Sequence, residues 1–315
     1  MNIAISGCCG FIGSLLCEYL LNRNYTVTGI DNFLYNNQYS VLHLLGNPKF
    51  KLIKANICHA NSISEIIKSA EIIICCHGLV GMPICKKMPQ MAWEVNAESI
   101  KNIVKILSKD QRLLIPNTNS GYGATDGTSE CTEISPVKPI SIYAQSKALG
   151  EEYALEHSNV VSLRLATVFG TSGRMRNDLL INNLFVKLYF DKQITLFEPH
   201  FMRNYCHIRD VIRGFGWAIY NGNGVYNFGN DDLNMSKLDL ANKICDYLSI
   251  YRSKITIDET QEDEDKRNYV VSSNKIIKSG FKFEHSLEDG FNELSTICKI
   301  YDKKELLLMG NVVVS

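Results

Sequence analysis

The first half of the chain alternates short apolar segments with segments of helical periodicity, and this pattern limits the choice of fold more than any other feature. Asn2–Ser6 is a predicted strand, and apolar residues then recur at i, i+3, i+4, i+7 and i+8 from Ile12 to Leu20. Further strands are predicted at 25–31, 50–54, 71–76, 112–115 and 160–165, and further helices around 100–107 and 142–156. Repeated β–α alternation predicts an α/β fold, a doubly wound parallel sheet with helices on both faces.

The regularity fades after about residue 166. Gly, Asn, Asp and Arg crowd the stretches 170–178 and 221–234. We therefore expect two domains, one over 1–165 and a smaller, loop-rich one over 166–315, with some chain exchange around 205–225. The second domain is expected to lie over the carboxyl edge of the sheet, where open α/β sheets bind ligands.

Composition excludes several function classes. The 33 Lys and Arg residues balance the 33 Asp and Glu residues, so the chain lacks the basic excess that favours nucleic acids or anionic membranes. No apolar run approaches the roughly 18 residues of a transmembrane helix, and the chain opens directly on a predicted strand, which leaves no room for a signal peptide. The 11 cysteines form no C-x-x-C pair, which favours free thiols, no metal site and a cytoplasmic location.

Three glycines stand between the first strand and the first helix, in the segment GCCGFIG. Gly7 would allow the tight turn, Gly10 would let a pyrophosphate approach the backbone, and Gly13 would let helix and strand pack closely. Phe11 and Ile12 open the helix, whose N-terminus favours anions. An ordinary strand–helix turn is the alternative, but strand, helix and spacing together predict a Rossmann-type dinucleotide site.

Asp31 ends the second predicted strand, where a dinucleotide fold uses a carboxylate to bind the adenosine ribose hydroxyls. A carboxylate there repels the 2′-phosphate of NADP, and Asn32 follows instead of an arginine. The pair therefore favours NAD as the cofactor. A turn or helix-capping aspartate is the alternative interpretation.

Tyr143 and Lys147 are four residues apart on a predicted helix, so their side chains share one face. A nearby ammonium favours phenolate, lowers the pKa of the tyrosine and makes it a usable general base. A surface pair is the alternative for this common spacing. The fifth strand ends in NTNSGYG, and a hydroxyl there can bond the same substrate oxygen that the tyrosine deprotonates.

At these residues the sequence resembles the extended short-chain dehydrogenase/reductase family, the NAD-dependent nucleotide-sugar epimerases and dehydratases. The resemblance runs over nearly the whole chain, through GCCGFIG, WEVN (93–96), NTNSGYG, YAQSK (143–147), LRLATVFG (163–170), RNYCHIRD (203–210), VYNFG (225–229) and LEDGF (287–291). Within the family it is most similar to the GDP-heptose 4-dehydrogenases of bacterial capsule pathways, through LVGMPICK (79–86), CTEISPVKPIS (131–141), GRMRNDLLINN (173–183) and DKRNYVVS (265–272).

The resemblance implies roles for individual residues. Tyr143 would be the catalytic base, Lys147 its electrostatic partner and a ligand of the nicotinamide ribose, and Thr118 the family's Ser/Thr. The cofactor residues would be Gly7, Gly10, Phe11, Ile12, Gly13, Asp31, Asn32, Asn56, Ile57, Tyr143 and Lys147. The substrate residues would be Thr118, Asn119, Ser120, Thr167, Arg174, Arg176, Arg203 and Arg267, with Arg203 on the nucleotide diphosphate.

Three positions depart from the family's pattern. The 4,6-dehydratases carry an Asp-Glu pair after the threonine, whereas this chain has Asn119 and Ser120, so elimination of water by that route is not expected. His77 stands where small residues commonly line the cofactor, and it would either hold a structural hydrogen bond or touch the ligand. Thr167 replaces the asparagine of many epimerases.

The leading hypothesis is NAD-dependent oxidation of the C4 hydroxyl of a nucleotide sugar, with a GDP-sugar favoured by the resemblance. A 4-epimerase would use the same Thr118, Tyr143 and Lys147, so the motifs do not separate the two. A non-catalytic NAD-binding scaffold is the third hypothesis, although such proteins typically lose the tyrosine or the lysine. The resemblance also implies a homodimer.

Overall fold

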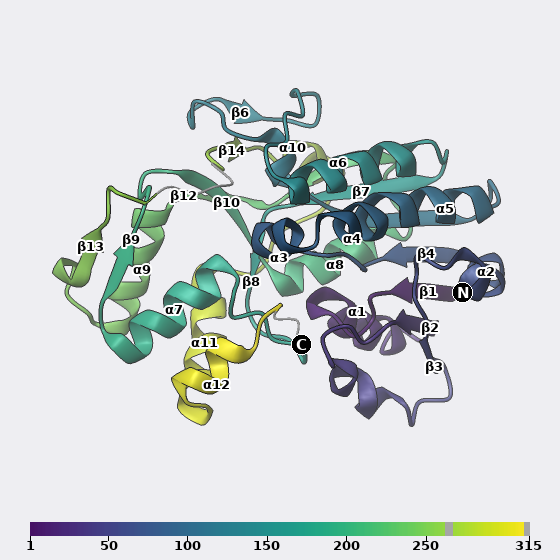
Figure 1. Ribbon diagram of the computed structural model, residues 1–315, viewed down its shortest axis with the longest axis horizontal. Coiled ribbons are helices and arrows are strands. Elements are labelled where there is room, and N and C mark those ends of the chain that lie inside the picture. The colour runs from purple at the N-terminus through teal and green to yellow at the C-terminus, as the bar shows by residue number, and fades with distance from the viewer. Residues whose placement is uncertain (262–266, 312–315) are drawn as a thin grey trace.

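A parallel seven-stranded sheet dominates the computed structural model, which describes residues 1–261 and 267–311 (Figure 1). Every neighbouring pair in this sheet runs parallel. From edge to edge the strands are β3 (Phe50–Lys54), β2 (Thr26–Asp31), β1 (Asn2–Ser6), β4 (Ile72–Cys75), β5 (Arg112–Thr118), β7 (Val160–Leu165) and β11 (Gly224–Phe228). This sheet confirms the predicted doubly wound α/β fold.

Successive residues of each strand point to opposite faces, and each face has its own apolar core. On one face Ile3 and Ile5 pack in the same core as residues of α1 (Phe11–Leu21) and α8 (Ile208–Ala218). On the other face Ala4 and Ile73 pack with residues of the helices α2 (Ala60–Ser69), α5 (Ser99–Ile106) and α6 (Ile142–Leu155). Because both faces are covered, the central strands are apolar on both sides.

Two elements from the second half of the sequence pack with the region formed by the first half. The strand β11 pairs with β7 at the edge of the large sheet, and α8 packs against α1. Both elements belong to the second half of the sequence, and α8 lies within the stretch 205–225 where we expect chain exchange, whereas β11 lies mostly after it.

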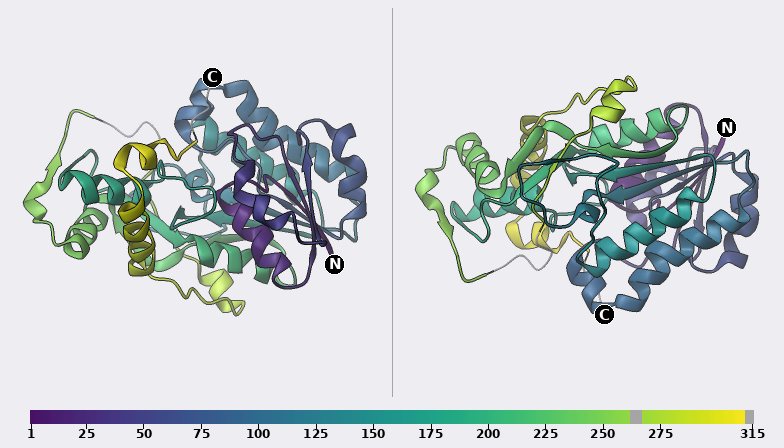
Figure 2. Two further views of the ribbon diagram at one scale, coloured as in Figure 1. Left: turned by 90° about the horizontal axis from the view of Figure 1, so that it is seen from below. Right: turned by 90° about the horizontal axis from the view of Figure 1, so that it is seen from above.

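A second, smaller region lies beyond the carboxyl ends of the large sheet (Figures 1 and 2). Its core contains Phe185, Leu240 and Leu294, which are all buried. The helices of this region are α7 (Leu180–Asp191), α9 (Lys237–Leu248), α11 (Leu287–Ile300) and α12 (Lys303–Leu308). Its small sheets are β12-β10-β8 (Asn230–Ser236, Met202–His207, Thr167–Phe169), β13-β9 (Ile255–Ile257, Ile194–Leu196) and β14-β6 (Val270–Val271, Glu130–Cys131).

The remaining helices are short. Among the described residues, the remaining α-helices are α3 (Met82–Lys87), α4 (Pro89–Trp93) and α10 (Asn274–Lys278). Within 1–261 and 267–311, no helix has the length and apolar composition needed to cross a membrane. All 11 cysteines are free thiols, as the sequence predicts.

Candidate functional site

The glycine turn after β1 has the geometry that the sequence predicts. Gly7 has a φ of +71°, and a Cβ there would lie 2.5 Å from the backbone nitrogen of His77. A Cβ on Gly13 would lie 2.1 Å from the carbonyl oxygen of Gly7, so the third glycine is needed for α1 to pack against the turn. Gly10 donates its N–H to that same oxygen at 3.0 Å and is the N-cap of α1.

Asp31 ends β2 beside this turn. Its Oδ2 accepts a hydrogen bond from the backbone N–H of Cys9 at 3.0 Å, and its Oδ1 accepts one from Phe33 at 2.8 Å. Burial raises the pKa of the carboxyl above its usual value, although these backbone hydrogen bonds oppose the rise. The carboxylate therefore holds the glycine turn in place and also faces the cavity beside it.

A cavity of about 150 Å³ opens between the glycine turn and the ends of β2, β3 and β4. Asp31 lies on its wall. The other predicted cofactor residues on this wall are Gly7, Gly10, Asn32, Asn56 and Ile57. This cavity adjoins a larger one, since Gly10, His77 and Gly78 line both.

The larger cavity has a volume of about 520 Å³, within the usual range for a small-molecule site. Thr118 from the end of β5, and Tyr143 and Lys147 from the first turns of α6, share its wall with Phe11 and Ile12 from α1. The helix α6 begins where it does because the Ser141 hydroxyl accepts the N–H of Ala144. That cap sets Tyr143 in the first turn, facing the cavity.

The electrostatics of the pair differ from the sequence prediction. Burial raises the pKa of Tyr143 to about 12, and a hydrogen bond with Thr118 opposes that rise. Burial lowers the pKa of Lys147 to about 8. Its Nζ donates to the carbonyl oxygen of Pro116 at 2.6 Å, so the ammonium is engaged with β5. Burial of the Tyr143 hydroxyl outweighs the neighbouring charges and the hydrogen bond that lower its pKa, so the direction is opposite to the one that the spacing predicts.

Four arginines lie on the wall of the larger cavity, together with Thr118, Tyr143 and Lys147. Arg203 on β10 is only 2% exposed and lies on the cavity wall. Arg174 and Arg176 in the loop after β8 are also buried and reach the same wall. Arg267 joins them from the segment before β14. These four predicted substrate residues bring positive charge to one cavity, partly offset by Asp178, which lies on the same wall and pairs with Arg176. A cavity with an excess of guanidinium groups suits a diphosphate.

Of the two residues that follow Thr118, one lies on the wall of the larger cavity and the other does not. Ser120 is on the cavity wall, and its hydroxyl accepts a hydrogen bond from Thr118 Oγ1 at 3.2 Å. Asn119 is fully buried and is not on the wall. Neither side chain carries a carboxyl group. Thr167, at the start of β8, is on the wall.

His77 is held by two hydroxyl groups. Its Nδ1 lies 2.5 Å from Ser6 Oγ and its Nε2 lies 2.8 Å from Ser99 Oγ. Burial lowers the pKa of the imidazole to about 3, so the ring is neutral. These bonds give His77 a structural role between β1 and α5. The residue also lies on the wall of both cavities, so contact with a ligand stays a prediction.

Sequence reasoning missed several residues of the larger cavity. Lys237 lies at the N-terminus of α9, buried against the Phe197 ring at 4.6 Å. A signal was available, since a lysine in the first turn of a helix opposes the helix dipole and so suggests another role. Asn311, near the C-terminus, also lines the cavity, and no motif marked it.

Comparison with known proteins agrees with this geometry. Residues 3–229 match the model of the NAD dependent epimerase/dehydratase family. The uncharacterized UDP-glucose epimerase YtcB of Bacillus subtilis (strain 168) is 27% identical over 237 residues, covering 68% of this chain and 71% of YtcB.

Two solved structures have closely similar folds. The UDP-glucuronic acid 4-epimerase of Bacillus cereus, in complex with UDP-glucuronic acid and NAD, has a TM-score of 0.81 and 25% identity, with 96% of this chain and 100% of that chain covered. The dTDP-glucose 4,6-dehydratase of Bacillus anthracis, in complex with NAD, has a TM-score of 0.83 and 20% identity, with 97% and 99% covered.

The family match covers most of the chain and includes the glycine turn, Asp31, Thr118, Tyr143 and Lys147. It confirms the enzyme class and the NAD cofactor that the sequence predicts. The chain belongs to the NAD dependent epimerase/dehydratase family.

Proposed function

We propose that this enzyme oxidises the C4 hydroxyl of a nucleotide sugar. The observation that carries the proposal is the meeting of Thr118, Tyr143 and Lys147 with Arg203 and other cations around one 520 Å³ cavity. The hydroxyl groups would contact the sugar, and the cations would hold the diphosphate.

In this proposal NAD occupies the smaller cavity and the adjoining part of the larger one. The residues present suit it, since a carboxylate at Asp31 faces the ribose position and the Gly7 turn leaves no room for a Cβ. When bound, NAD would accept the hydride from the sugar carbon. A carboxylate at the ribose position disfavours the extra phosphate of NADP.

The chain's own residues would move the proton. Tyr143 would take the proton of the sugar hydroxyl, and Thr118 would bond the same oxygen and hold it in place. A phenol with a pKa of about 12 is a strong base once ionised, but it needs a neighbouring positive charge to ionise near neutral pH. Arg176 and Arg267 are cations whose charges already oppose the rise in its pKa, and Lys147 lies on the same cavity wall, one helical turn after Tyr143.

The fate of the keto sugar separates two candidate functions. Asn119 and Ser120 offer no carboxyl acid–base pair, so we do not expect loss of water. The sequence resemblance to GDP-heptose 4-dehydrogenases favours release of a 4-keto GDP-sugar. The UDP-sugar epimerases among the relatives favour the second candidate, a 4-epimerase that returns the hydride to the other face of the sugar.

One experiment separates them. The pure enzyme is incubated with NAD and a panel of GDP- and UDP-sugars, and the products are analysed by mass spectrometry and NADH absorbance. A dehydrogenase gives a keto product and equimolar NADH, whereas an epimerase gives a product of unchanged mass and no NADH. Size-exclusion chromatography with light scattering tests the proposed homodimer.

A further inference from the structure

The loop 170–178, called here the arginine loop, carries two of the cations of the larger cavity. Arg174 and Arg176 are 5% and 7% exposed, so each is fixed by its neighbours instead of moving in solvent. Arg176 is close enough to Tyr143 for its charge to oppose the rise in the pKa of that residue. The position of this loop therefore bears directly on the site.

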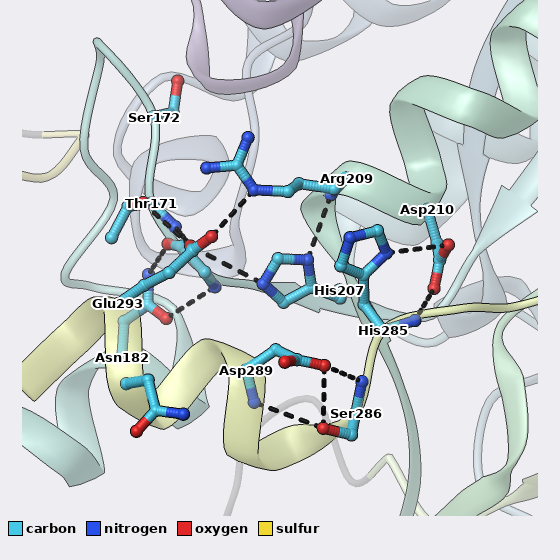
Figure 3. Close-up of polar contacts among 12 residues, drawn as sticks. Thr171, Ser172, Asn182, His207, Arg209, Asp210, His285, Ser286, Asp289 and Glu293 are labelled. Carbon is cyan, nitrogen blue, oxygen red and sulfur yellow. Dashed lines mark hydrogen bonds and ion pairs between the residues drawn. The ribbon is translucent and has the colours of Figure 1, made fainter.

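The first part of the arginine loop is held by α11 (Figure 3). Glu293 accepts hydrogen bonds from the backbone N–H of Thr171 at 2.9 Å and from its hydroxyl at 2.8 Å. The same carboxylate pairs with Arg209 at 2.8 Å. Ser172, the next residue, donates from its hydroxyl to the carbonyl oxygen of Phe11 at 2.8 Å, and so ties the loop to the start of α1.

The second part is held by the other end of the chain, residues 306–311, called here the C-terminal clip. Arg174 Nη2 donates to the carbonyl oxygen of Gly310 at 2.6 Å. Asn177 donates its backbone N–H to the carbonyl oxygen of Met309 at 2.7 Å. Its Nδ2 donates to the carbonyl oxygen of Leu306 at 2.8 Å. The clip is anchored in turn, because the Leu306 side chain is fully buried in the core of the second region.

Gly310 also limits where the Asp178–Arg176 pair lies. Asp178 binds Arg176 through two hydrogen bonds, of 2.7 and 2.8 Å. A Cβ on Gly310 would lie 3.1 Å from Asp178 Oδ1 and 3.2 Å from its Cβ and Cγ, which is closer than side chains normally pack. A larger residue at 310 would therefore displace Asp178, and Arg176 with it.

The clip reaches the cavity itself. Asn311 lies on the wall of the larger cavity and donates from Nδ2 to the carbonyl oxygen of Val80 at 3.2 Å. Val80 follows β4 and lines the same cavity. The last described residues thus join the arginine loop to the cofactor-binding half of the molecule.

We propose that the C-terminal clip is part of the nucleotide-sugar site, where it positions Arg174 and Arg176 and presents Asn311 to the substrate. The inference rests on the proposed function, because it takes the ligand of this cavity to be a nucleotide sugar. Arg174 and Arg176 remain the ligand-binding groups, and Gly310 is a positioning residue that acts through them.

The test compares Gly310→Val and Asn311→Ala with Gly46→Val. Gly46 is the matched control, since a Cβ there meets nothing within 4 Å, and neither glycine has a positive φ. GDP-mannose and UDP-glucose are titrated calorimetrically into each NAD-saturated protein, and NAD is titrated separately. We expect Gly310→Val to weaken nucleotide-sugar binding by about tenfold or more and Asn311→Ala by about threefold, with NAD affinity changed less than about twofold.

Equal nucleotide-sugar affinity in Asn311→Ala, Gly310→Val and Gly46→Val would overturn the role of the clip while leaving the proposed function intact. If Gly310→Val also loses NAD binding, its fold has changed, and Asn311→Ala alone decides in the same way. A wild-type protein that binds NAD but neither nucleotide sugar would contradict the proposed function, and the inference about the clip with it.

Discussion

Lys147 Nζ donates a 2.6 Å hydrogen bond to the carbonyl oxygen of Pro116, two residues before Thr118 on β5. The bond ties the first turns of α6 to the end of the strand that carries the candidate catalytic hydroxyl. It also places a cation where burial lowers its pKa to about 8. A buried ammonium thus joins two parts of the site. Because removing this charge from water is unfavourable, it lowers the free energy of unfolding at neutral pH.

This burial predicts a pH-dependent stability. The pKa of Lys147 is about 8 in the folded protein, below its usual 10.5, so the unfolded chain binds this proton more tightly. The free energy of unfolding should therefore rise as the pH increases from about 8 to about 10.5. Relative to Lys147→Met, the wild type should gain about 1–3 kcal/mol over this interval, as measured by urea denaturation.

The comparison with Lys147→Met removes the titration of all other groups, including Tyr143, because both proteins contain them. Lys101→Met, a change at a more exposed lysine, serves as the control and should follow the wild type. Parallel pH profiles for the wild type and Lys147→Met would show that the folded-state pKa of Lys147 is ordinary.

Replacing Tyr143 by Phe should lower turnover by about 10²–10⁴, the usual contribution of a positioned acid–base group. The ring and its packing remain, so NAD affinity should stay within about twofold of the wild type. Steady-state kinetics and calorimetry measure the two quantities. Tyr153→Phe is the matched control, since Tyr153 lies on the same helix and its hydroxyl bonds only weakly to Glu98, at 3.4 Å.

Near-normal turnover in Tyr143→Phe would remove this residue from the role of base. His77 would be a poor replacement as the base, because burial lowers the pKa of its imidazole to about 3 and so makes it a weak proton acceptor.

Asp31 should make the enzyme prefer NAD over NADP. The 2′-phosphate of NADP would meet the carboxylate. Asp31→Ala should therefore lower the ratio of the NADP dissociation constant to the NAD dissociation constant by about tenfold or more. Because Asp31 also accepts the N–H of Cys9, the variant should bind NAD itself more weakly. Calorimetric titration of both cofactors tests this, and a wild type with equal affinity for NAD and NADP would contradict the prediction.

The sheet could be predicted because its signals are local. Strands such as 2–6 and 160–165 are mostly apolar, and the helices between them follow a 3.6-residue period. The second region could be expected only in outline, since its small sheets pair distant segments, such as β13 with β9 and β14 with β6. No local pattern encodes such pairings.

The candidate site shows the same division. The i, i+4 spacing correctly sets Tyr143 and Lys147 on one helix face, but spacing does not determine a rotamer, and the ammonium turns to Pro116. The motifs also do not predict that Asn119 is buried or that burial raises the pKa of Tyr143. Both depend on residues from other parts of the chain that pack around the site. Asn311 lies on the cavity wall just after α12, which packs against α7, an element far from it in sequence.

The most direct test of C4 oxidation follows the hydrogen itself. A GDP-sugar, GDP-heptose or GDP-mannose, is prepared with deuterium at C4 and incubated with the pure enzyme and NAD, and both products are analysed by mass spectrometry. The account predicts a 4-keto sugar and an equimolar amount of reduced cofactor carrying the deuterium. A sugar of unchanged mass with inverted C4 and no reduced cofactor would establish the epimerase instead, and a product lighter by one water would contradict the role given to Asn119 and Ser120. Deuterium retained at an unaltered C4 with every GDP- and UDP-sugar tested would contradict the central claim.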